Sequence, residues 1–125
     1  MSMTLDDYQK KAMTFAKFSS LDYPFDGLCE EVGEVSGKLA KAQRKWGMCK
    51  ESVLENIYHG LHHVMSEEEI QLHNNLKKEL GDCLWMLQAC ASNLNLTLGE
   101  IAEENINKLT DREQRGVIVG SGDNR

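Results

Sequence analysis

The chain has 125 residues, 41% of them hydrophobic and 27% charged, with a formal net charge of −6. This balance is typical of a globular protein rather than a disordered one, and the length suits a single domain with its own core. An acidic chain without a block of Lys and Arg is a poor match for a nucleic acid polymer, whose phosphates need a basic face. The sequence has neither a signal peptide nor an apolar run of the roughly 18 residues that span a membrane, so we expect a cytoplasmic protein outside the membrane.

The first half of the chain predicts two helices. Proline occurs once and β-branched runs are rare, which favours an all-α fold. The first helix is expected from its N-cap, Thr4, to about Phe18, because apolar residues recur at helical spacing in between. Residues 19–24 interrupt it, and Asp26 is expected to cap a second helix that ends near Lys45.

The second half predicts one short helix and two longer ones. Residues 52–64 carry apolar side chains at helical spacing and predict the short helix. Ser66 and Thr97 each begin an S/T-x-x-E capping box, a signature of a helix N-terminus. The helices that they open are expected to end near Asn93 and Leu109.

Together these elements predict a four-helix bundle with a short inserted helix. We expect one domain over residues 1–125, with an insertion at about 48–65 and an irregular tail over 116–125. The third main helix carries a leucine seam that offers more apolar face than one small bundle can cover, which predicts an oligomer. The seam consists of Leu76, Leu80, Leu87 and Leu94.

Two pairs of carboxylates, each spaced three residues apart in a predicted helix, are the strongest functional signal. They are Glu31/Glu34 and Glu79/Asp82. Residues at i and i+3 share a helical face, so each pair directs two acids to one spot beside the apolar stripe of its helix. If the helices pack together, the acids converge and need a counter-charge, which a hard divalent cation such as Mg²⁺ supplies. The alternative is a solvated acidic rim.

Each acid pair encloses a glycine, Gly33 or Gly81. Glycine inside a helix costs up to about 1 kcal/mol relative to alanine. We therefore expect the two helix backbones to approach closely beside the site. Glu30, which precedes the first pair, either orients a ligand or water from behind the site or is an exposed helical residue.

Three segments resemble the motifs of a known enzyme family. Residues 30–34 (E-E-V-G-E) and 79–82 (E-L-G-D) are similar to the E-E-x-x-E and E-x-x-D motifs of the all-α nucleotide pyrophosphohydrolases. Residues 105–112 resemble the closing N-x-x-K-L-x-x-R helix of that family. The resemblance covers roughly residues 8–46 and 66–116, and it is strongest to the MazG-like proteins, including phage-type and mobile-element members.

The resemblance implies a MazG-like four-helix fold that acts as a homodimer or homotetramer. The implied reaction is Mg²⁺-dependent hydrolysis of a (d)NTP to a monophosphate and pyrophosphate, with Mn²⁺ as a substitute metal and nucleotide-pool housecleaning as the role. A water molecule would attack after losing a proton to Glu30 or Glu31. The implied metal ligands are Glu31, Glu34, Glu79 and Asp82.

The same resemblance implies substrate contacts from two other regions. Asn105, Lys108 and Arg112 would contact phosphates or sugar, whereas without the resemblance they would be a solvated face near a helix C-terminus, where cations are favoured. Phe15 and Phe18 could stack on the base, although core packing is the more ordinary role of such residues.

The sequence is compatible with more than one substrate and with a non-catalytic role. The segment between the two acid motifs is longer than usual for the family because of the insertion, which could reshape the nucleotide pocket or a subunit interface. One alternative is an enzyme similar to phosphoribosyl-ATP pyrophosphohydrolase. Another is a non-catalytic helical module that binds metal or nucleotide, and a turnover measurement separates it from the enzymes.

Overall fold

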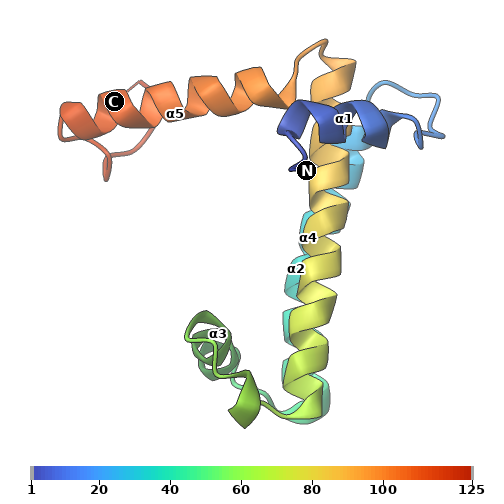
Figure 1. Cartoon of the computed structure of the whole chain (residues 1–125), viewed down its shortest axis with the longest axis vertical. Helices are drawn as coiled ribbons and strands as arrows, with labels where there is room; N and C mark the ends of the chain where they lie inside the picture. The colour runs from blue at the N-terminus through green and yellow to red at the C-terminus, as the bar shows by residue number, and fades with distance from the viewer. Residues whose placement is uncertain (1, 125) are drawn as a thin grey trace. The chain divides into compact units, whose positions relative to one another are not determined.

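The computed structural model describes residues 2–124, and within this range the regular elements are all helical, which confirms the predicted all-α fold (Figure 1). In chain order they are α1 (Leu5–Met13), α2 (Tyr23–Trp46), α3 (Lys50–Tyr58), the 3₁₀ turn η1 (His62–Val64), α4 (Glu67–Asn93) and α5 (Leu98–Gln114). None of the helices in the described range has both the length and the apolar content of a membrane span. The chain divides into two compact units, one made of Met1–Lys17 with Gln88–Arg125 and the other of Phe18–Leu87.

The predicted capping boxes are confirmed at both positions. The Ser66 hydroxyl accepts from the Glu69 backbone N–H at 3.2 Å, and the Glu69 carboxylate accepts in return from the Ser66 N–H. Thr97 and Glu100 form the same reciprocal pair at the start of α5. These bonds satisfy backbone donors that have no partner within the helix, and therefore fix where α4 and α5 begin.

The start of α2 and the end of α1 differ from the prediction. The N-cap of α2 is Asp22 rather than Asp26, because Pro24 fits the first turn, where its missing N–H costs nothing. The first helix ends at Met13, not near Phe18. Its chain tightens there, since the N–H groups of Thr14 and Phe15 donate to carbonyls three residues back rather than four.

Two further helix ends also differ from the prediction. The inserted helix covers Lys50–Tyr58 instead of 52–64, and the 3₁₀ turn η1 follows it. The last helix continues to Gln114, five residues beyond Leu109. Its final turns carry no apolar stripe to predict them, and the ion pair between Asp111 and Arg115, four residues apart, supports them instead.

In the unit Phe18–Leu87, α2 and α4 pack as an antiparallel helical hairpin. Gly27 lies against Met86 at one end, and Ala42 packs in a core with Leu72 at the other. Val53 of α3 belongs to the same core, so the insertion is part of the packing rather than a surface addition. Figure 1 shows α3 beside the end of the hairpin where the chain passes from α2 to α4.

The expected close approach at Gly33 and Gly81 is wrong. Both glycines are exposed, and a Cβ at either position would have no neighbour within 4 Å. The close approach lies at Gly27 instead, where a Cβ would be 2.7 Å from the Met86 sulfur. The helices therefore come together one turn before the acidic residues of α2, not between them.

In the other unit, α1 caps the first turn of α5. The buried Gln9 accepts from the Leu98 N–H at 2.7 Å and donates to the Leu96 carbonyl at 2.9 Å. The Asp6 carboxylate accepts from the Gly99 N–H at 2.8 Å. Because these donors lie at a helix N-terminus, side chains from α1 satisfy groups that α5 cannot satisfy itself.

This arrangement predicts a stability defect for Gln9→Ala. Losing the amide leaves the buried Leu98 N–H without its acceptor, which should lower the free energy of unfolding by about 1–3 kcal/mol. Urea denaturation followed by circular dichroism measures the change. Gln114→Ala, at an exposed position of α5, is the matched control and should leave the midpoint almost unchanged; equal effects of the two variants would contradict the capping role.

Candidate metal and nucleotide site

Three of the predicted acidic residues converge between α2 and α4. Glu31 of α2 and Glu79 and Asp82 of α4 each place one carboxylate oxygen within 4.8 Å of the others. Glu79 and Asp82 share a face of α4 because they are three residues apart. The hairpin then sets Glu31 opposite them, between the Gly27–Met86 contact and the core around Ala42.

The other two predicted acids lie outside this group. Glu30 and Glu34 are both exposed, whereas Glu31 is half-buried. A spacing of three residues leaves about 60° between two side chains around the helix axis, so Glu31 can face α4 while Glu34 points further toward solvent. Both still act on the group through charge, since each raises the pKa of Glu31.

The electrostatics of the group are those of crowded like charges. Partial burial raises the pKa of Glu31 first, and the carboxylates of Asp82, Glu30, Glu79 and Glu34 raise it further. The thiol of Cys83, next to Asp82, also has a raised pKa because of burial and the carboxylates of Glu31, Asp82 and Glu79. Ionised carboxylates at this spacing therefore disfavour one another, and a cation in their midst would relieve the repulsion.

A lysine that the sequence reasoning missed supplies part of the counter-charge. Lys38 Nζ lies 3.7 Å from Glu79 Oε1, and the Glu79 side chain is only 15% exposed. Lys38 follows Glu34 by four residues and Glu31 by seven, so its spacing already placed it on the acidic face of α2. One ammonium does not balance three carboxylates, and the group retains a net negative charge.

The two predicted aromatic residues have different surroundings. Phe18 is half-buried and packs edge-on against Trp85, with ring centroids 6.0 Å apart, and at a tilt against Tyr23 at 5.8 Å. Phe15 is 60% exposed, and the Lys11 ammonium lies 5.5 Å from its ring centre. Of the two, Phe18 alone belongs to an aromatic cluster with Tyr23 and Trp85, which sequence reasoning had not assembled.

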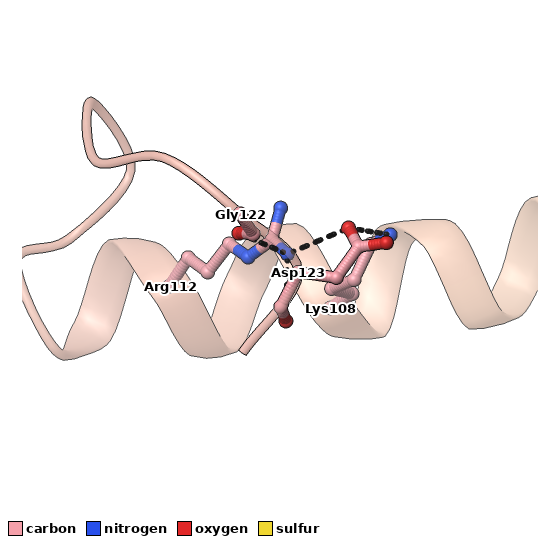
Figure 2. Close-up of polar contacts among 4 residues, drawn as sticks. All are labelled: Lys108, Arg112, Gly122 and Asp123. Carbon is pink, nitrogen blue, oxygen red and sulfur yellow. Dashed lines mark hydrogen bonds and ion pairs between the residues drawn. The ribbon is translucent and has the colours of Figure 1, made fainter. Parts of the chain in front are cut away.

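The predicted polar residues of the last helix lie on α5, in the other unit. Asn105 and Lys108 line a shallow depression together with Ile101 and Glu104. Lys108 and the buried Arg112 both contact Asp123 of the C-terminal segment (Figure 2). Because α5 is helical over this range, the spacing of three and four residues puts Asn105, Lys108 and Arg112 along one side of it.

Comparison with known proteins identifies the family. Residues 23–117 match the family described as the MazG nucleotide pyrophosphohydrolase domain. The chain belongs to the MazG family. It is also 34% identical over 105 residues to the Gene 37 protein of Mycobacterium phage L5, a match that covers 84% of this chain and 76% of that protein. No solved structure matches the chain. The predicted MazG-like, phage-type membership is confirmed.

The donor set of this MazG protein fits a hard divalent cation. Its three converging side chains offer oxygen ligands only. Mg²⁺ and Mn²⁺ prefer oxygen donors, whereas softer metals prefer sulfur. The nearby Cys83 thiol does not belong to the converging group. Glu31, Glu79 and Asp82 are therefore the residues that could hold such a cation.

The thermal stability of Glu31→Gln, measured with and without Mg²⁺, tests this site. In metal-free buffer the variant should melt slightly above the wild type, because one of the repelling charges is gone. Mg²⁺ should stabilise the wild type, by about 2.7 kcal/mol at a concentration one hundred times Kd, and should no longer stabilise the variant. Thermal denaturation measures both, with the exposed Glu55→Gln on α3 as the charge-matched control. An undiminished Mg²⁺ effect in Glu31→Gln would exclude Glu31 as a ligand.

Proposed function

We propose that this MazG protein is a divalent-metal-dependent nucleoside triphosphate pyrophosphohydrolase. The reaction is (d)NTP + H₂O → (d)NMP + pyrophosphate, with nucleotide-pool housecleaning as its role. The observation that supports it best is the convergence of Glu31, Glu79 and Asp82 in a member of this family. The negative charge of a triphosphate repels an attacking hydroxide. A cation held among carboxylates would neutralise part of that charge.

The acids have separate tasks in this proposal. Glu31, Glu79 and Asp82 hold Mg²⁺, or Mn²⁺ in its place, and the exposed Glu34 completes the set from its edge. A cation held by these residues would neutralise phosphate charge and polarise the phosphoryl oxygens. Either Glu30 or Glu31 accepts a proton from the attacking water.

Residues outside the acidic group are further candidates for contact with the substrate. Lys108 and Arg112 pair with phosphate oxygens, and Asn105 beside them donates to phosphate or sugar. Phe18 is the better candidate for stacking on the base, because it already lies against Trp85 with its ring partly exposed. Phe15, exposed and outside that cluster, is the weaker one.

Steady-state hydrolysis of a panel of standard and modified NTPs and dNTPs, with products resolved as pyrophosphate or orthophosphate, tests the reaction. We expect pyrophosphate release that requires Mg²⁺ and falls about 100-fold or more in Glu31→Gln. Glu55→Gln removes the same charge from an exposed position on α3 and should keep wild-type turnover. Full turnover in Glu31→Gln would overturn the role of Glu31. A folded protein that binds Mg²⁺ but hydrolyses nothing in the panel would instead be the non-catalytic module.

We also propose that the protein is a homodimer or homotetramer that associates through α4. Leu80, Leu84 and Leu87 repeat at i, i+4 and i+7 and therefore share one side of α4, yet they are 58%, 37% and 42% exposed. Val32 of α2, in the same unit, is 53% exposed. An apolar stripe of this kind is a common sign of a protein interface, and a second copy is the partner that every solution of the protein contains.

Light scattering on the purified chain tests the association. The wild type should have at least twice the mass of one chain at micromolar concentration, and Leu84→Glu should shift it toward the monomer because the charge would have to be buried. Leu54→Glu on α3 is the matched control, since Leu54 is 44% exposed and lies outside the stripe. A monomeric wild type would remove this proposal and leave the catalytic one standing.

A further inference from the structure

The C-terminal segment turns back along α5 at a helix-ending motif. The Val117 N–H donates to the Arg112 carbonyl at 2.9 Å, and the Gly116 N–H donates to the Glu113 carbonyl at 3.1 Å. These two bonds with Gly116 in the left-handed region, at a φ of +73°, form a Schellman motif. A second left-handed residue, Gly122 at +79°, precedes Asp123 and bends the chain again.

The result is a contact between Asp123 and the two basic residues of α5, which Figure 2 shows. Arg112 Nη2 lies 3.3 Å from Asp123 Oδ1 and donates to the Asp123 backbone carbonyl at 3.1 Å. Lys108 Nζ lies 3.4 Å from the same Oδ1. One carboxylate oxygen therefore receives both cations, as a phosphate oxygen would.

Burial differs sharply across this contact. The Arg112 side chain is 6% exposed, whereas that of Asp123 is 86% exposed. A buried guanidinium needs an anionic partner, because an unpaired charge away from water is costly. Its partner here, the Asp123 carboxylate, is so exposed that it can leave for water at little cost. Arg112 and Lys108 in turn lower the pKa of Asp123, so the carboxylate is ionised at neutral pH.

We propose that residues 117–124 act as an internal occupant of the phosphate-binding side of α5, with the Asp123 carboxylate in the place of a substrate phosphate. This inference rests on the proposed function, in which Lys108 and Arg112 bind phosphates. An incoming polyphosphate exchanges one anionic partner of Arg112 for another, so the guanidinium stays paired throughout. The end of the segment, residues 120–124, then moves away from α5. Because the closed state must open first, nucleotide binds more weakly than it would to Lys108 and Arg112 without the Asp123 carboxylate.

Binding of inorganic pyrophosphate in metal-free buffer, measured by calorimetry on the full chain, tests the exchange. Without metal, no cation can link pyrophosphate to the carboxylates of Glu31, Glu79 and Asp82, so the titration senses the basic residues. Asp123→Asn should bind pyrophosphate about two- to tenfold more tightly than the wild type, the range expected when one exposed ionic competitor is removed. Asp111→Asn is the matched control, because Asp111 pairs with Arg115 and should leave the affinity unchanged.

Removing the Asp123 charge could by itself tighten pyrophosphate binding, so a second variant and a second measurement test whether the segment moves. Gly122→Ala keeps the Asp123 charge but strains the left-handed turn, and it should also tighten binding. In the wild type, pyrophosphate should lower the heteronuclear ¹⁵N NOE of residues 120–124, because the segment becomes mobile. The value should then equal that of the same residues in Asp123→Asn without pyrophosphate. Unchanged or weaker affinity in Asp123→Asn, or a segment that stays ordered at saturation, would overturn the inference.

The outcomes separate this inference from the proposed function. If Mg²⁺-dependent hydrolysis is present but Asp123→Asn binds pyrophosphate no better than the wild type, the internal-occupant inference fails alone. If Lys108→Met binds pyrophosphate as well as the wild type, Lys108 is no phosphate ligand, and that part of the proposed function fails with it.

Discussion

The mutual repulsion of Glu31, Glu79 and Asp82 is the constraint on which the chemistry of this protein depends. The three carboxylates are held within 4.8 Å of one another by contacts on either side of them along the α2–α4 hairpin. Gly27 against Met86 closes one side, and the core of Ala42, Val53 and Leu72 closes the other. Apolar packing thus supplies the free energy that keeps like charges together, and Lys38 offsets only part of their repulsion.

The insertion matters to this balance because it belongs to the core. Val53 of α3 is 3% exposed and packs with Ala42 and Leu72, while Ile57 covers the same cluster from the edge. Without α3 the hairpin would lose part of the packing that opposes repulsion among the acids. The longer linker between the two acid motifs therefore also stabilises the hairpin that carries the acidic group.

The two units differ in how their clustered charges are balanced. In the unit Phe18–Leu87 the acids outnumber their one lysine, which leaves room for a cation. In the other unit the cations Lys108 and Arg112 already have an anion, Asp123. A cation is complementary to the acidic group, and an anion is complementary to Lys108 and Arg112. The charge pattern of the chain thus agrees with the activity proposed for a MazG protein.

The sequence by itself determined the all-α class, the family, the starts of α4 and α5 and the acidic motifs, because each of these signals lies within a few residues of chain. Capping at Ser66 and Thr97 needs only the residue three positions on. Only the tertiary structure decided that Glu31 rather than Glu34 joins Glu79 and Asp82, and that Gly27 rather than Gly33 marks the close approach. Both outcomes depend on how far one helix is rotated against another, and local spacing carries no record of that angle. The partnership of Arg112 with Asp123 likewise exists only after the chain has turned back at Gly116.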